Sequence, residues 1–265
     1  MLLSLFDNLL GVVSPQVAEE KTKHESFTLQ VKDKTIPVTI LFEKRFNNKV
    51  YINHLGINMS INNQQSKDDQ KKSIDYFLKW AKNKLDKKPH LLEYLPQRKY
   101  ANGEILQVGK DIFTINVFYH SSEKSTAKLF KHQIIISLCK GLTPKAEQDT
   151  CSFLVSKCLI KYFTPIVTQR VHALNDAYFK KEINNVRLKY NTSNWGSCST
   201  QGNVNISLRL MFAPQDVIDY VIVHELAHLY HMNHSKKFWA LVEKVMPDYR
   251  EKEKHLEENN FKYYL

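Results

Sequence analysis

The front of the chain alternates apolar and polar residues, which predicts β-strands. This period of two runs through residues 26–60 and again through residues 103–138. Between them, residues 62–72 are polar and have no period, so we expect a loop there. Residues 74–85 place their apolar side chains at helical spacing instead. The pattern therefore predicts two groups of strands, separated by one helix near residues 74–86.

Most of the remaining sequence predicts helices. Residues 144–163 and 165–179 form two candidate helices, and each begins with a proline, which the first turn of a helix tolerates. Two short runs, residues 186–190 and 203–211, predict a pair of strands. The residues that open the three helices expected after them are Pro214, Ser235 and Asp248.

These elements indicate an α+β fold in three parts. We expect a lead segment over residues 1–25 that could form a helix, a strand-rich region over residues 26–140, and a mainly helical domain over residues 141–265. The lead segment carries Asp7 and lacks a basic start and a clear cleavage site, so we do not expect a signal peptide. We expect neither a transmembrane segment nor an internal repeat.

Composition adds information on charge and redox state. The chain has 38 Lys and Arg against 27 Asp and Glu, a net charge of +11. Such a surplus attracts polyanions, although scattered lysines without an arginine-rich run are also typical of a solvated surface. The cysteines Cys139, Cys151, Cys158 and Cys198 form no C-x-x-C pair. We therefore expect reduced thiols and a cytoplasmic protein.

An apolar segment, VIVHELAHL, carries histidines where a helix would face the core. His224, Glu225 and His228 form an H-E-x-x-H motif. On a helix, residues four apart lie on one face, so both imidazoles can point at one metal ion. Glu225 is rotated by about 100° from His224 and can reach a metal-bound water without being a ligand. Zinc lowers the pKa of its water to about 7, and a carboxylate can take the proton, so the motif predicts a hydrolytic zinc site.

A catalytic zinc needs three protein ligands and one open position. The candidates for the third ligand are His231, which still falls near the helix, and His234. His234 follows Asn233, a residue suited to ending a helix with a left-handed turn. We favour His234, because a chain that reverses at Asn233 can return its imidazole to the ion. Half-buried structural histidines and a zinc kept only for stability remain the alternatives.

Several longer motifs occur in order between residues 154 and 257. They are NWGSCS from Asn194, NISLRLMFAP from Asn205, VIDYVIVHELAHL from Val217, NHSKKFW from Asn233 and MPDY from Met246. In this combination and spacing, the chain resembles the YgjP-like metal-dependent hydrolases, which are related to the SprT-like and WLM zinc peptidases. Members of that family usually carry Arg where this chain has Asn194, so any role of that Arg must be filled differently here.

The resemblance implies a zincin-like core, built from an H-E-x-x-H helix and a small antiparallel sheet. It also implies that zinc is held by His224, His228 and His234, with Glu225 as general base. In zincins an edge strand lies across the active-site cleft and pairs with the backbone of an extended peptide. A substrate-binding strand is therefore expected beside the metal site.

The candidates for that strand are Trp195, Gly196, Ser197 and Cys198, and residues 204–208 are the alternative. Gly196 would let a peptide backbone approach closely. Cys198 could lie near the metal as a redox-sensitive ligand, although a small buried hydrophobe is its more ordinary role.

Aromatic residues near the motif are open to similar pairs of interpretations. We expect Phe238 and Trp239 to pack in the core rather than stack on substrate. Tyr249 and His255 are candidates for stabilising an oxyanion. A group that orients each ligand imidazole is also expected, but the sequence does not identify one.

The sequence therefore predicts a zinc metallopeptidase that cleaves peptide bonds in an extended or unfolded polypeptide. The SprT-like relatives act on proteins crosslinked to DNA, and the net charge of +11 is compatible with a DNA-associated protease. A non-catalytic binding module stabilised by zinc is a further alternative. No recognised DNA-binding motif occurs, and no membrane partner is expected.

Overall fold

The chain folds into two compact units, and the boundary between them follows Pro89. They are Met1–Pro89 and His90–Leu265 in the computed structural model, which describes residues 23–53, 56–94 and 100–265. The predicted lead segment, residues 1–25, lies almost entirely outside the described residues.

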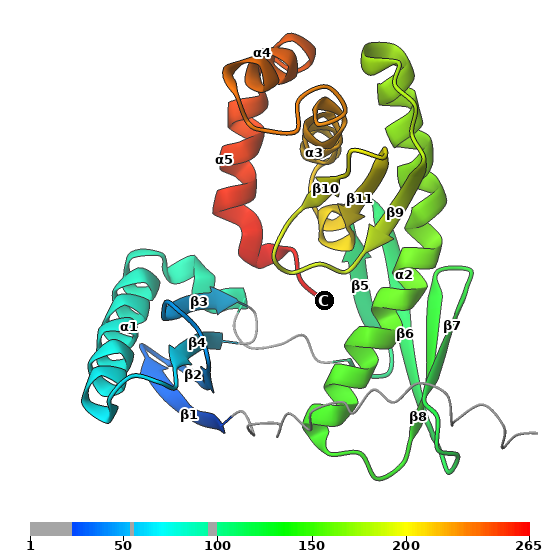
Figure 1. The fold of residues 1–265 in the computed structure, drawn as a ribbon. Helices are drawn as coiled ribbons and strands as arrows, with labels where there is room; N and C mark the ends of the chain where they lie inside the picture. Colours follow the sequence, from blue (N-terminus) through cyan, green and yellow to red (C-terminus); the bar gives the residue numbers. More distant parts are fainter. Residues whose placement is uncertain (1–22, 54–55, 95–99) are drawn as a thin grey trace, which may run out of the picture. The chain divides into compact units, whose positions relative to one another are not determined.

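The first unit is a four-stranded sheet followed by a long helix (Figure 1). Its elements are β1 (Lys23–Val31), β2 (Lys34–Glu43), β3 (Lys49–Asn53), β4 (Gly56–Asn62) and α1 (Lys67–Lys87). The strand order is β1-β2-β4-β3, with β2 and β4 parallel and the outer pairs antiparallel. α1 begins earlier than residue 74, where apolar spacing placed it, because the Ser66 hydroxyl caps the helix by accepting the Asp69 amide at 3.2 Å.

The second unit begins with another four-stranded sheet and holds the remaining helices. Its first elements are β5 (Glu104–Val108), β6 (Asp111–His120), β7 (Thr126–Phe130), β8 (Gln133–Cys139) and α2 (Pro144–Leu174). They are followed by β9 (Asn185–Lys189), β10 (Gly196–Cys198), β11 (Asn203–Ser207), α3 (Gln215–Ala227), α4 (Lys236–Val245) and α5 (Tyr249–Asn259). The starts of α3, α4 and α5 confirm the positions predicted from Pro214, Ser235 and Asp248.

The sheet of the second unit repeats the topology of the first, which corrects the expectation of no internal repeat. Its order is β5-β6-β8-β7, again with the middle pair parallel and the outer pairs antiparallel. In both sheets Leu-Gln-Val leads into the first hairpin turn, where Val31 pairs with Lys34 and Val108 with Asp111. The repeat lies in strand order and turn placement, which many different residues satisfy, and this is why the sequence conceals it.

The boundary after Pro89 differs from the predicted change of domain near residue 140. β5 to β8 belong with the second unit because their apolar face shares its core. Phe113 and Ile136 from this sheet are buried in the same cluster as Val155 from α2 and Ile222 from α3. A change from strands to helices along the chain therefore does not mark the boundary here.

α2 is one helix where two were predicted, because it continues through Pro165. An internal proline removes a hydrogen bond and weakens a helix. The buried stripe nevertheless keeps its helical spacing, with Leu159 and Phe163 before the proline and Val167 and Val171 after it. Burial of this stripe outweighs the local loss.

The segment Pro144–Phe179 is also long and apolar enough, by length and composition, to cross a membrane, and it is the one such helix among the described residues. In the fold its apolar side chains contribute to the core of the second unit. We therefore interpret it as a core helix.

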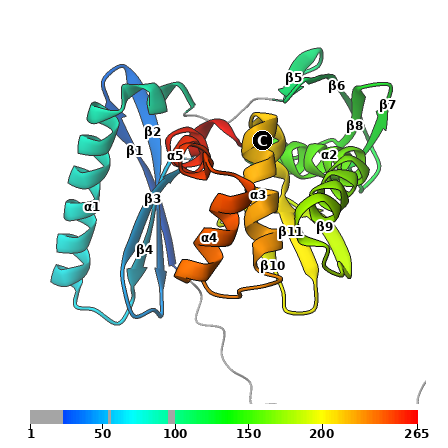
Figure 2. The same cartoon turned by 90° about the horizontal axis from the view of Figure 1, so that it is seen from above.

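The small sheet beside α3 is mixed, which corrects the antiparallel sheet implied by the resemblance. Its order is β10-β11-β9, with β10 antiparallel and β9 parallel to β11. The chain reverses direction twice between β9 and β11, and β10 takes the outer edge, so β9 and β11 run the same way. α3 lies between this sheet and the pair α4 and α5 (Figures 1 and 2).

Candidate metal centre and cleft

Three histidines from α3 and the loop after it come together. His224 and His228 lie one turn apart at the end of α3, and His234 lies just before α4. One ligand nitrogen of each is within 4.8 Å of the other two, and the Nε2 atoms of His224 and His234 are 3.0 Å apart. His231 is not part of this group.

The chain reaches His234 by tight turns rather than by the expected left-handed turn at Asn233. Past Ala227, the amide of Leu229 donates to the Leu226 carbonyl at 3.0 Å and that of Tyr230 to Ala227 at 3.0 Å. These three-residue bonds tighten the helix end and redirect the chain before Asn233. Positive φ angles outside glycine occur, among the described residues, at Lys32, Lys131, His132 and Lys180.

The backbone of His231 orients one of the imidazoles. Its carbonyl lies 3.0 Å from Nδ1 of His228. A carbonyl oxygen can only accept, so Nδ1 carries the proton and Nε2 is left as the ligand nitrogen. His231 thus contributes through its main chain, a role that the sequence did not reveal.

Two aromatic residues at the start of α4 pack against the histidine group. Phe238 is fully buried, and its ring centroid lies 4.6 to 4.9 Å from those of His224, His228 and His234. Trp239 lies 5.7 Å from His224 and 5.8 Å from His234. Both residues therefore pack around the imidazoles and exclude water from one side of them.

Glu225 lies on the other side of α3, directly against β10. Its side chain is 5% exposed, and a Cβ atom added to Gly196 would lie 2.5 Å from Glu225 Oε1. Any larger residue at Gly196 would therefore collide with the carboxylate. The H-E-x-x-H carboxylate and the candidate substrate strand are thus in close contact.

The charges of the site respond to burial. Burial, followed by the neighbouring His228 and His234, lowers the pKa of His224 to about 4. Burial also lowers the pKa of His228, and it raises the pKa of Glu225 to about 8. Neutral imidazoles are the form that binds a metal ion, and a cation beside Glu225 would offset the desolvation of its carboxylate. The residues present therefore fit a divalent metal.

β10 is the edge strand, because β11 is paired on both sides. The Trp195 carbonyl and the Ser199 amide bond toward β11, at 2.8 Å to Ser207 and 3.0 Å to Asn203. Since main-chain groups alternate along a strand, those of Gly196 and Cys198 face the free edge. The Gly196 carbonyl accepts a hydrogen bond from the Asn194 side-chain amide at 3.0 Å, which gives Asn194 a local role at the start of the edge strand.

Cys198 stays a protonated thiol at neutral pH. Burial, and then the nearby Glu225, raises its pKa to about 11. Its sulfur lies 3.6 Å from the Ser199 carbonyl, and it does not belong to the metal-ligand group found among the described residues. These observations favour a small, partly buried side chain over a metal ligand.

A pocket of about 440 Å³ opens beside Glu225. Its lining residues are Asn194, Trp195, Gly196, Tyr220, Val221, His224, Glu225, Glu253, Leu256, Glu257 and Asn260. They come from the start of β10 and the two residues before it, from one face of α3, and from α5 and the residue after it, so the pocket continues the cleft beside the histidine group. Tyr220 lies one turn before His224 and is 4% exposed. Burial, then the carboxylates of Glu253, Glu225 and Glu257 with Tyr249 among them, raises the pKa of Tyr220.

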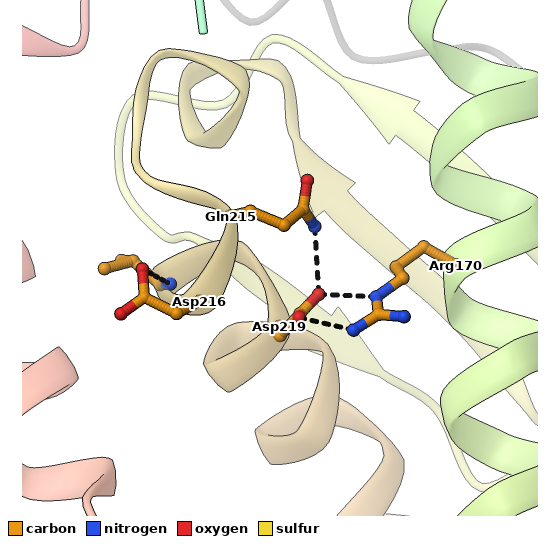
Figure 3. A network of polar contacts seen from close by, with 5 residues as sticks. Arg170, Gln215, Asp216 and Asp219 are labelled. Atoms are coloured by element: carbon orange, nitrogen blue, oxygen red, sulfur yellow. Dashed lines mark hydrogen bonds and ion pairs between the residues drawn. The ribbon is translucent and has the colours of Figure 1, made fainter. Parts of the chain in front are cut away.

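Polar contacts fix α3 between its neighbouring helices (Figure 3). Arg170 of α2 donates from Nε and Nη2 to the two oxygens of Asp219, at 2.7 and 2.6 Å, and Gln215 adds a third hydrogen bond at 3.0 Å. Lys252 of α5 pairs with Asp216 at 2.6 Å. These contacts hold α3, and hence its histidines, at both sides of the helix.

The buried Arg209 supports the strand side of the cleft. It is 2% exposed and donates to the carbonyls of Thr192 at 3.0 Å and Tyr263 at 2.8 Å, and to the side chain of Asn260. Its guanidinium lies 4.2 Å from the Trp195 ring centroid. Arg209 thereby connects the end of the chain to the segment before β10.

The two candidates for stabilising an oxyanion, Tyr249 and His255, are not among the described residues that line this pocket. His255 bonds to the Tyr263 hydroxyl at 2.7 Å, and Tyr249 stacks on Trp239 with 5.2 Å between centroids. Tyr220, which does line the pocket, was missed, although its spacing of four from His224 signals a shared helix face.

Comparison with known proteins identifies the family of this chain. A family model described as YgjP-like, metallopeptidase domain, matches residues 47–259. The solved zymogen of the metallopeptidase abylysin from Pyrococcus abyssi is 25% identical, over 34% of this chain and 90% of that one, with a TM-score of 0.31. The zymogen of jannalysin from Methanocaldococcus jannaschii is 18% identical, over 36% of this chain and 96% of that one, with a TM-score of 0.32. No curated protein matches the chain. Because both TM-scores are low, the functional interpretation rests on the family match and on the residues of the site.

Proposed function

Since the chain belongs to the YgjP-like metallopeptidase family, we propose that it is a zinc-dependent peptidase with a zincin-like centre. In this proposal His224, His228 and His234 hold the ion and Glu225 is the general base. The convergence of three imidazole nitrogens within 4.8 Å, beside a buried carboxylate, is the observation that supports it. Three imidazoles suit zinc and leave a fourth position open for water or substrate.

Each part of the cleft has a task in peptide hydrolysis. Zinc, when bound, would polarise the scissile carbonyl and lower the pKa of a coordinated water. Glu225 takes the proton from the attacking water and delivers it to the amide nitrogen as the C–N bond breaks. The outward main-chain groups of Gly196 and Cys198 pair with the peptide backbone, which suits an extended polypeptide of varied sequence.

The experiment combines metal analysis with a Glu225→Gln variant. Purified wild-type protein and the variant are compared for zinc per chain and for cleavage of a panel of unfolded proteins. We expect about one zinc per chain in both, and a loss of turnover on the order of 10²-fold or more in the variant. Glu258→Gln, an exposed carboxylate on α5 outside the pocket, is the matched control and should behave as wild type.

Two outcomes would contradict the proposal. Full activity in Glu225→Gln would remove the general-base role, and zinc binding that survives the loss of His224 and His234 together would remove the proposed ligand set.

The four cysteines support a reducing, cytoplasmic setting for the enzyme, because none of them forms a disulfide. They are Cys139, Cys151, Cys158 and Cys198.

A further inference from the structure

The pocket beside Glu225 has a charge that contrasts with the whole chain. The chain carries a net charge of +11, yet the pocket is lined by Glu225, Glu253 and Glu257 and by no lysine or arginine. The Arg209 guanidinium lies 4.2 Å from the centroid of the Trp195 ring and donates hydrogen bonds to the carbonyls of Tyr263 and Thr192. The pocket is therefore a local region of negative charge.

Glu253 and Glu257 lie one turn apart on the same face of α5. Among the described residues, neither carboxylate forms an ion pair or a hydrogen bond. Asp216 of α3 and Asp248 before α5, by contrast, both pair with Lys252, at 2.6 and 3.1 Å. Two unpaired carboxylates facing one pocket repel each other, and a bound cation would relieve this repulsion.

Tyr220 adds an independent indication of a ligand. It is 4% exposed and lines the pocket from α3, and its hydroxyl makes no hydrogen bond to any described residue. The Tyr220 side chain is thus almost entirely buried, while its unpartnered hydroxyl stays available to a hydrogen-bond donor of a ligand in the pocket. Tyr220 and Trp195 both line the pocket, and aromatic side chains attract cations.

We propose that this pocket binds a cationic group of the peptide substrate, with Glu253 and Glu257 as counter-charges and the Tyr220 hydroxyl as hydrogen-bond acceptor. The group is an alkylammonium or guanidinium, from a Lys or Arg side chain, or the ammonium of a free N-terminus. The inference rests on the proposed peptidase function, because the pocket borders Glu225 and the metal centre and would fix which peptide bond lies there. It gives the enzyme a preference for basic substrates.

The test measures binding without turnover. Fluorescence anisotropy of labelled peptides measures their affinity for the zinc-loaded Glu225→Gln protein. The peptides share one extended sequence, and either Lys or norleucine is placed at each position in turn. We expect one position at which Lys binds at least about 10-fold more tightly than norleucine, corresponding to about 1.4 kcal/mol. The preference should weaken with added salt.

Variants of α5 then assign the preference. Adding Glu253→Gln and Glu257→Gln should abolish the advantage of Lys and leave norleucine peptides bound as before, which also shows that the protein is folded. Glu251→Gln with Glu258→Gln, two α5 carboxylates outside the pocket, is the matched control and should retain the preference. Tyr220→Phe should reduce it.

N-terminal acetylation separates the two sources of the cation. A preference for Lys that persists in acetylated peptides assigns the pocket to a basic side chain. Equal binding of Lys and norleucine peptides, together with weaker binding of both after acetylation, assigns it to a free N-terminus. Binding that depends neither on Lys nor on the free N-terminus, a charge preference that survives the Glu253→Gln and Glu257→Gln changes, or no binding of any peptide would each overturn the inference. A charge preference without hydrolysis by the wild type would instead fail only the peptidase proposal, so the two are distinguishable.

Discussion

Replacing Glu225 with Gln should stabilise the metal-free protein, and more so as the pH rises. Burial raises the pKa of Glu225 from its ordinary 4.5 to about 8. Between these values the folded protein keeps a proton that the unfolded chain has released, so the wild type loses stability as the pH increases. At about 1.36 kcal/mol per pKa unit, the loss is roughly 1 kcal/mol at pH 5 and roughly 3 kcal/mol at pH 7. A glutamine does not titrate and is free of this loss.

Urea unfolding of chelated protein at pH 5, 6, 7 and 8 measures the effect. The difference in free energy of unfolding between Glu225→Gln and wild type should grow by about 2 kcal/mol from pH 5 to pH 7. Glu251→Gln, which changes an exposed carboxylate of α5 outside the pocket, is the matched control. If the difference in free energy of unfolding stays constant from pH 5 to pH 8, the Glu225 carboxylate is not destabilised by burial and this reasoning is refuted. Zinc should reduce the difference, because a cation beside Glu225 stabilises its ionised form.

Four further predictions follow from the same structure. Gly196→Ala, whose Cβ would lie 2.5 Å from Glu225 Oε1, should keep its zinc and lower kcat/KM about 10-fold or more; unchanged kinetics would contradict the contact. Asp219→Asn weakens the pairing with Arg170 and should lower the free energy of unfolding by about 1–3 kcal/mol, and an unchanged urea midpoint would oppose this. Chelation should lower the melting temperature, and zinc should restore it; identical melting curves would argue against a bound ion. If the net charge of +11 serves a nucleic-acid partner, affinity for duplex DNA should fall steeply with salt, and weak, salt-insensitive binding would exclude the DNA-associated alternative.

Local signals predicted the helices around the site well. Pro214, Ser235 and Asp248 precede α3, α4 and α5 as expected, although none of their side chains makes a capping hydrogen bond. The preference of these residue types for helix starts is a local property of the sequence. The H-E-x-x-H spacing likewise predicted that His224 and His228 share a helix face, and their ligand nitrogens do lie together.

Features set by distant parts of the chain were not predictable. Pro165 reads as a helix start, but burial of the stripe on both sides of it keeps α2 continuous. The parallel pairing of β9 with β11 depends on which strand takes the edge, and the unit boundary depends on which elements share a core. Neither the strand pairing nor the unit boundary can be predicted from a local sequence pattern.

The candidate site shows the same division. His234 joins the histidine group as favoured, but through tight turns after Ala227 rather than a left-handed Asn233. Tyr220 could have been found from its spacing to His224. Glu253 and Glu257 could not, because only the packing of α5 beside α3 brings them to the cleft.

X-ray absorption at the zinc edge of the loaded protein tests the central claim most directly. The account predicts three imidazole nitrogens at about 2.0–2.1 Å and one exchangeable oxygen, with one imidazole lost in His234→Ala. A sulfur neighbour near 2.3 Å, which Cys198 could supply, or a fourth imidazole from His231, would mean a closed site and contradict a hydrolytic centre.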